Sequence, residues 1–80
     1  MADREEKAIL ADVEEDGAAL RLADGRRLLV SPDDAAVASV WLPAARLTLR
    51  EDGGRGRRAA FSLTVTNEDT GDRIAADPGR

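Results

Sequence analysis

The side chains that could do chemistry in this sequence are almost all carboxylates. Two acidic runs stand out, Glu14-Glu15-Asp16 and Asp33-Asp34, and paired carboxylates can in principle act as general acid and base. The chain contains no histidine, cysteine or tyrosine, so its serines have no imidazole to activate them. The first run is typical of a solvated turn and the second of a capped helix start. We therefore predict no enzyme activity and no cofactor.

The segment from Asn67 to Asp72 places oxygen-bearing side chains at alternate positions, as a calcium-binding loop does. An EF-hand loop needs glycine at its sixth position and glutamate at its twelfth, where this sequence has Asp72 and Pro78. An asparagine that opens a turn more often accepts hydrogen bonds from the backbone that follows it. We therefore predict an Asx-type turn here, and no metal site.

Charge is distributed unevenly along the chain. The sequence has 16 acidic and 12 basic residues, a net charge of −4, and ten of the acids fall in residues 1–40 with five of the bases. Those acids gather around the first two expected turns and the start of the expected helix. If they converge, they form an anionic surface that could dock on an arginine- or lysine-lined groove. The candidate acidic patch consists of Asp12, Glu14, Glu15, Asp16, Asp24, Asp33 and Asp34.

An alternative candidate patch is basic, because arginines occur both beside the Asp24-Gly25 turn and in the glycine-rich segment 52–58. Such a cluster could contact phosphates. Nucleic-acid sites without sequence preference also use aromatic platforms, and Trp41 and Phe61 sit at positions expected to be buried. A net-acidic chain repels a polyanion at long range, so nucleic acid is the less favoured partner. The candidate basic patch consists of Arg26, Arg27, Arg55, Arg57 and Arg58.

The elements that must position these side chains are mainly strands. Residues 46–50 and 61–66 alternate apolar and polar side chains with a period of two, which predicts antiparallel strands with one buried face. Residues 19–22 and 27–30 flank an Asp-Gly pair, a strong signal for a hairpin. The sequence therefore predicts at least four strands.

Residues 8–14 fit either a strand or the start of a helix. We favour a strand, with Ile9, Ala11 and Val13 on one face, because the Asp16-Gly17 pair then completes a three-strand meander. Residues 73–76 could add a short last strand.

One short helix is predicted over residues 31–42. Ser31 suits the N-cap, Pro32 the first helical position, and Pro43 ends the helix because it disfavours helical geometry in the residue before it. The apolar face expected to cover the sheet consists of Val37, Val40 and Trp41.

The order β-β-β-α-β-β predicts a mainly β fold with one short α-helix. A sheet of this size tends to curl and protect its edges, so we expect a small twisted antiparallel sheet or a half-open SH3-like or Sm-like barrel. Residues 1–80 form a single domain, with residues 1–6 and 77–80 as mobile ends. The core is thin, which leaves a homodimer open. The chain has no cysteine and no apolar run of signal-peptide or membrane-spanning length, so we expect a cytoplasmic protein without membrane contact.

In size, acidity and lack of catalytic residues the whole chain resembles the small acidic anti-CRISPR proteins and related phage-borne inhibitors. The arginines at 55–58 depart from a uniformly acidic surface. The resemblance implies a non-catalytic inhibitor that blocks the basic nucleic-acid-binding groove of a bacterial protein or nucleoprotein complex before target DNA binds. The sequence thus predicts a protein-binding module. The alternatives are an SH3-like or Sm-like nucleic-acid adaptor that uses the Arg55–Arg58 loop, or a self-associating interaction domain.

Overall fold

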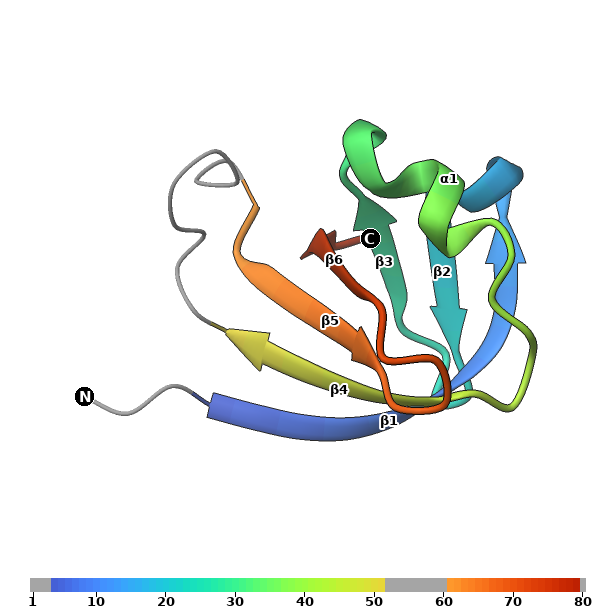
Figure 1. Ribbon diagram of the computed structural model, residues 1–80. Helices are drawn as coiled ribbons and strands as arrows, with labels where there is room; N and C mark the ends of the chain where they lie inside the picture. The colour runs from blue at the N-terminus through green and yellow to red at the C-terminus, as the bar shows by residue number, and fades with distance from the viewer. Residues whose placement is uncertain (1–3, 52–60, 80) are drawn as a thin grey trace.

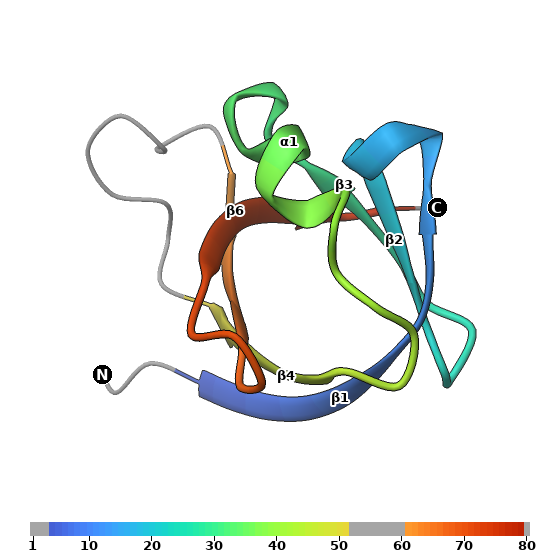
Figure 2. The same cartoon turned by 45° about the vertical axis from the view of Figure 1, so that its right-hand side comes forward.

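The computed structural model describes residues 4–51 and 61–79. Neighbouring strands pair antiparallel throughout, and they close into a barrel in the order β1-β2-β3-β6-β5-β4 (Figures 1 and 2). The predicted small barrel with one short helix is confirmed, and the sixth strand is present. The strands are β1 (Arg4–Glu14), β2 (Ala19–Leu22), β3 (Arg27–Val30), β4 (Arg46–Glu51), β5 (Leu63–Asn67) and β6 (Arg73–Pro78). The helical segments are η1 (Glu15–Gly17), η2 (Pro32–Asp34) and α1 (Ala35–Ala38).

β1 is long enough to have two neighbours. Residues 4–9 pair with β4, and residues 10–14 pair with β2. The change of neighbour coincides with a register shift between Leu10 and Asp12, a β-bulge that bends the strand. Leu10 is therefore fully buried and Val13 partly buried, whereas Ile9 and Ala11 are exposed. The predicted strand is confirmed, but its predicted inner face is wrong for these two exposed residues.

β6 changes neighbours in the same way, and this closes the barrel. Its residues 73–76 pair with β5, and residues 76–78 pair with β3. The backbone N–H and the hydroxyl of Ser62 both donate to the Asp77 carboxylate, at 2.8 and 2.9 Å. The N–H of Gly79 donates to the carbonyl of Arg27. Residues 77–79 are thus part of the barrel rather than a frayed tail, and residues 4–6 likewise pair with β4.

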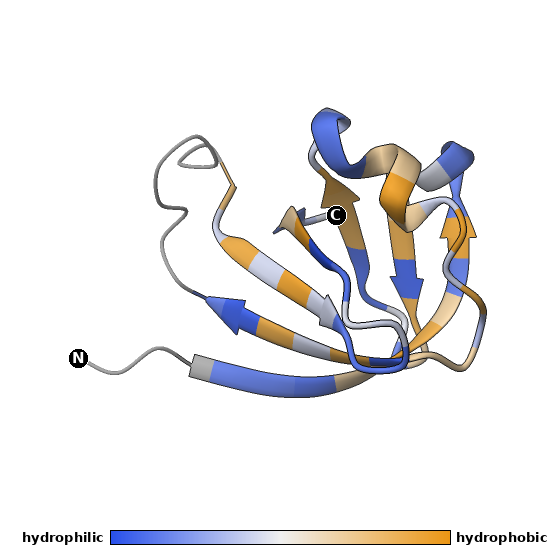
Figure 3. Cartoon of the chain, in the orientation of Figure 1, coloured by the Kyte–Doolittle hydropathy of each residue, from blue (hydrophilic) through white to orange (hydrophobic). Residues whose placement is uncertain are grey.

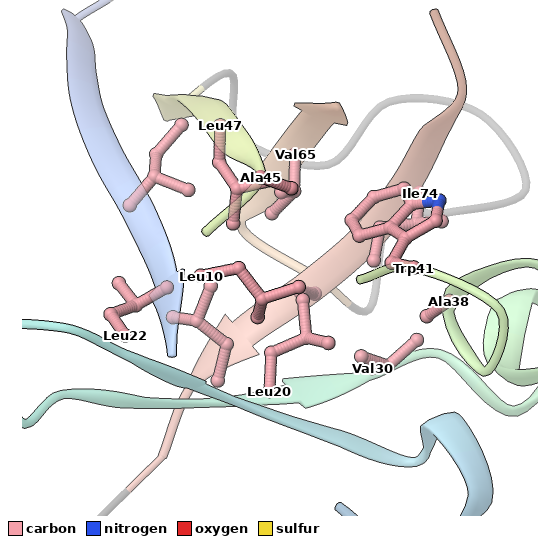
Figure 4. Close-up of a cluster of buried hydrophobic side chains, with 13 residues drawn as sticks. Leu10, Leu20, Leu22, Val30, Ala38, Trp41, Ala45, Leu47, Val65 and Ile74 are labelled. Carbon is pink, nitrogen blue, oxygen red and sulfur yellow. The ribbon is translucent and has the colours of Figure 1, made fainter. Parts of the chain in front are cut away.

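Apolar side chains from all six strands fill the barrel interior (Figure 4). In β4, Leu47 and Leu49 are buried and Arg46 and Arg50 are exposed, as predicted, but Thr48 between the leucines is buried as well. Phe61, which was expected in the core, lies before β5 and is half-buried. The largest fully buried side chains are Leu10, Leu20, Leu22, Leu47, Ile74, Val65 and Asn67.

One end of the barrel is covered by η1, η2 and α1, and the chain then runs down the side of the barrel to β4 (Figure 1). We call these three segments, with the chain that follows up to Ala44, the helical cap. Gly17 lets η1 pack directly on α1. It has a φ of +95°, and a Cβ at this position would lie 2.0 Å from the carbonyl oxygen of Ala35. α1 is therefore held to η1, the β1–β2 connection, by backbone contact.

The predicted apolar face of the helix is wrong for two of its three residues. α1 ends at Ala38, and the N–H of Trp41 returns to the Ala38 carbonyl, so a helical spacing is not kept beyond that point. Ala38 and Trp41 face the core, as predicted for the indole, while Val37 and Val40 are 37% and 72% exposed.

Candidate protein-binding surface

The outer face of β1, β2 and β3 brings together several predicted acids, each with an arginine beside it. Asp12 on β1 lies directly opposite Arg21 on β2, with 3.7 Å between carboxylate and guanidinium. Glu14 is 3.8 Å from the same guanidinium and 2.9 Å from Arg27 on β3. Arg27 also binds Glu15, at 2.5 Å. The hydrogen bond that Arg27 donates to Glu14, followed by the charge of Glu15, raises the pKa of Arg27.

The hairpin turn between β2 and β3 repeats this arrangement. Asp24 accepts hydrogen bonds from the backbone N–H of Arg26 at 3.0 Å and from its Nε at 2.8 Å. The two terminal nitrogens of the same guanidinium donate to both carboxylate oxygens of Glu6, at 3.0 and 2.7 Å. The backbone bond, and then the Arg26 side chain, lowers the pKa of Asp24, while Glu6 raises the pKa of Arg26.

The predicted acidic and basic patches therefore interleave on a single face. Four of the seven predicted acids are paired with arginines, and two of the five predicted arginines take part in those pairs. Exposed ion pairs add little to stability, but they reduce the net charge that this face presents to a partner. The other three predicted arginines, Arg55, Arg57 and Arg58, lie outside the described residues.

Asp34 belongs to the interior of the fold and cannot be part of an exposed patch. It is 5% exposed, and its Oδ2 accepts the backbone N–H of Ala75 on β6 at 2.8 Å. The N–H of Ser31 donates to the carbonyl of the same alanine at 2.9 Å. Neither Ser31 nor Asp34 makes a side-chain cap bond to its helix, so the capping role predicted for both is wrong. The two residues instead fasten the helical cap to β6.

The two remaining predicted acids, Asp16 and Asp33, lie in η1 and η2 on either side of α1 (Figure 3). Both are exposed, and neither takes part in an ion pair among the residues that the structure describes. The same cap exposes three apolar side chains, Val37, Val40 and Leu42, the last two at 72% each. Its segments, residues 15–17 and 32–44, contain no lysine or arginine.

Sequence reasoning missed this surface because it placed two of the three valine and leucine side chains in the core. A signal was present in the sequence. The expected helix ends at Pro43, which disfavours helical geometry in Leu42. Apolar residues next to its C-terminal proline could therefore have been read as exposed.

The outer face of β1 and β4 carries a chain of polar contacts. Lys7 Nζ donates to the Thr48 hydroxyl at 2.9 Å, and that hydroxyl bonds to Glu68 at 2.5 Å. A hollow of about 500 Å³ lies beside this chain. The charged groups on its rim are already engaged within the fold, including Arg46, which binds Asp69 at 2.9 Å and lowers its pKa. The residues lining the hollow are Lys7, Ala8, Ile9, Arg46, Leu47 and Glu68.

The predicted Asx turn is confirmed. The Asn67 side-chain oxygen accepts the N–H groups of Asp69 at 2.8 Å and Thr70 at 3.3 Å. Asp72 in the same turn accepts the indole N–H of Trp41 at 3.3 Å, which links the turn to the helical cap. Within residues 4–51 and 61–79, no group of three or more acidic side chains is arranged to hold a metal ion.

In comparisons with known proteins, no family model, no curated protein and no solved structure matches this chain. In the described part of the chain, no helix has the length and apolar character needed to span a membrane.

Proposed function

We propose that this protein is a non-catalytic protein-binding module and that the helical cap is its binding surface. The observation that carries the proposal is the composition of the cap. Val40 and Leu42 are each 72% exposed, the carboxylates of Asp16 and Asp33 make no ion pair with any described residue, and the cap segments contain no lysine or arginine. A surface of this kind complements a partner that combines apolar pockets with lysine or arginine.

Apolar side chains that protrude from a small domain are natural anchors, because they gain free energy when a partner removes them from water. Carboxylates beside them select partners by charge. The charged face of β1–β3 is less suited to this role, since its acids are already bound to Arg21, Arg26 and Arg27. Among the predicted acids, Asp16 and Asp33 therefore contribute most to recognition.

In its finer form, the proposal is that the module inhibits a bacterial cytoplasmic protein or nucleoprotein complex by occupying a basic groove that normally holds nucleic acid. The sequence supports this form through its charge, because 16 acidic and 12 basic residues give a net charge of −4. Such a field attracts a basic surface and speeds association. It also disfavours binding to nucleic acid itself, as does the engagement of Arg26 and Arg27 with carboxylates.

The test is capture of partners from a nuclease-treated bacterial lysate, followed by mass spectrometry, with the wild type and two cap variants. Val40→Ser with Leu42→Ser removes the apolar anchors, and Asp16→Lys with Asp33→Lys reverses the charge of the cap. All four side chains are exposed, and thermal unfolding checks that both variants stay folded, since Asp16 has a left-handed backbone with a φ of +57°. We expect both to lose a captured protein that has a basic nucleic-acid-binding surface, and we expect DNA to compete for that protein.

The matched control is Asp12→Arg with Glu14→Arg, which makes the same change of charge on the β1–β3 face. Retention of the partner by this control and its loss from the cap variants would support the cap. If the control alone lost the partner, the binding surface would be the charged strand face. If the wild type recovered only RNA or DNA from an untreated lysate, a nucleic-acid adaptor would replace the proposal.

A further inference from the structure

The first half of β1 has one hydrogen-bonding edge that no described part of the chain covers. The pairing of β1 with β2 begins at Leu10, so residues 4–9 have β4 as their sole neighbour among the described strands. Figure 2 shows this half of β1 extending beyond the β2–β3 hairpin. An uncovered edge of this kind is a template for another strand.

The backbone groups on that edge can be identified from the hydrogen bonds at the other end of the strand. The N–H and C=O of Leu10 point toward β4, where they bond to Ala45 and Ala44. The carbonyl of Ile9 points the opposite way and accepts the N–H of Ala23. Because successive residues of a strand alternate in direction, Lys7 and Glu5 direct their N–H and C=O groups to the open side.

The side chains of the same two residues have opposite charges and lie on the outer face. Glu5 contacts Arg50 at 2.8 Å across the β1–β4 pair, and Lys7 contacts Thr48 at 2.9 Å. Glu6, between them, faces the barrel opening, and its carboxylate is bound by both terminal nitrogens of Arg26. The edge thus carries one acid and one base, two residues apart, with the intervening acid already neutralised.

We infer that this edge binds a second copy of the chain, with the two β1 strands antiparallel about a twofold axis at Glu6. In this register Glu5 of each copy lies directly opposite Lys7 of the other. Both residues direct their backbone groups to the edge, so each such pair exchanges two hydrogen bonds. Opposite charges directly across an antiparallel pair are favourable. Across the junction, the outer face would carry Arg50 and Glu5 of one copy, followed by Lys7 and Thr48 of the other. Positive and negative side chains would therefore alternate.

The register matters because the alternatives lack this match. If one β1 strand slides by one residue along the other, residues that face the partner lie opposite residues that face β4. The hydrogen bonds are then lost. Two residues of pairing form a small interface, so the dimer is weak and depends on protein concentration. The two Glu6 side chains lie opposite each other at the axis. Arg26 is needed because it compensates the negative charge of each Glu6 carboxylate.

The experiment is analytical ultracentrifugation of the full chain over a range of concentrations up to about 1 mM, which detects weak association. The wild type should dimerise. Lys7→Glu and Glu5→Lys each place like charges opposite one another and should weaken the dimer at least about tenfold. The double variant Glu5→Lys with Lys7→Glu should restore it, which a merely local effect on either residue would not do.

A backbone variant tests the same edge, with Lys7→Ala as the control that removes the same charge but keeps the N–H and should weaken the dimer less. Lys7→Pro removes an N–H that points to the open side, and proline is tolerated on such an edge. It should abolish the dimer while the protein keeps its circular dichroism spectrum and cooperative unfolding. Arg73→Glu is the matched control, because it makes the same change of charge as Lys7→Glu on an exposed position of β6 and should leave the dimer intact.

A wild type that stays monomeric at all concentrations would overturn the inference, and so would a dimer that survives Lys7→Pro. If Val40→Ser with Leu42→Ser abolished the dimer and Lys7→Pro did not, the copies would meet through their helical caps. The inference and the proposed function use different residues, so each can fail alone.

Discussion

β1 and β6 both change neighbours, so each has a stretch with a strand on only one side. The backbone groups on the open side of these two stretches differ in their hydrogen-bond partners. In β6, the N–H of Ala75 bonds to the Asp34 carboxylate, and its carbonyl accepts the N–H of Ser31. In β1, the corresponding groups of Glu5 and Lys7 have no bonding partner among the described residues. The β6 groups lie beneath the helical cap, whereas those of β1 lie at the opposite end, where Glu5 and Lys7 are exposed.

This difference follows from the energetic cost of an unpaired backbone group. A buried N–H without a partner costs about 1–3 kcal/mol, whereas one at an exposed edge can bond to water. A barrel of short strands must leave some half-strands without neighbours where the ring closes. Here the buried one is covered by a side chain of the same molecule. The exposed one is left available to another chain.

The largest difference between β6 and β1 is expected from a pair of proline substitutions, one in each strand. Ala75→Pro removes the N–H that Asp34 accepts, leaves that carboxylate buried without its donor, and adds a ring at a site that is 1% exposed. We expect a loss of about 4 kcal/mol or more in the free energy of unfolding. Lys7→Pro should cost less than about 1 kcal/mol. Urea denaturation followed by circular dichroism measures both, and equal losses would contradict the comparison.

The next largest effect concerns the close contact between η1 and α1 within the helical cap. In Gly17→Ala, the new methyl group would meet the carbonyl of Ala35, and alanine is also strained at a φ of +95°. We expect a loss of about 3 kcal/mol. Gly25→Ala is the control, because φ is +97° but no atom lies within 4 Å, so strain alone should cost about 1 kcal/mol. The difference between the two variants in urea denaturation isolates the packing of η1 on α1.

Asp34 itself is expected to show a smaller effect. Asp34→Ala leaves the Ala75 N–H buried without that acceptor and should lower the free energy of unfolding by about 2 kcal/mol. Asp34→Asn keeps an oxygen that can accept the same bond and should recover part of the loss. Asp33→Ala, one residue earlier and exposed, should change stability by less than about 0.5 kcal/mol. A loss as large for Asp33→Ala would mean that the carboxylates act through charge rather than by covering β6.

Local patterns were sufficient to predict much of the fold. The Asp24-Gly25 turn, the buried leucines of β4 and the Asn67 turn depend on residues close together in the sequence, and the structure confirms all three. The same holds for Trp41, whose burial was predicted. In each case the residue types themselves restrict the backbone or the exposed face.

The errors arose where distant segments determine the outcome. The bulge in β1 depends on where β2 and β4 exchange places along it, so Ile9 looked like a core residue. Asp34 looked like a helix cap because its partner, Ala75, is 41 residues away. The arginines within the predicted acidic patch were missed for the same reason, since the pairing of β1, β2 and β3 places Arg21 and Arg27 among its acids.

The smallest expected effect is a pH dependence that tests whether Arg26 supports the open edge. Hydrogen bonds from Arg26 lower the pKa of Asp24 below its ordinary 3.8, and Arg46 does the same for Asp69. A carboxylate with a lowered pKa in the folded state stabilises the fold above the pKa of the unfolded chain. That stabilisation is lost as the pH falls through the lower, folded value.

Asp24→Asn and Asp69→Asn should therefore each lower the melting temperature slightly at about pH 6, and the difference from wild type should vanish by about pH 2. Only Asp24→Asn should also weaken the dimer at neutral pH, because Asp24 holds the guanidinium that neutralises Glu6 at the twofold axis. Thermal unfolding and ultracentrifugation of the same two variants separate these effects. Equal weakening by Asp69→Asn would mean that net charge, and not the β1 edge, controls association.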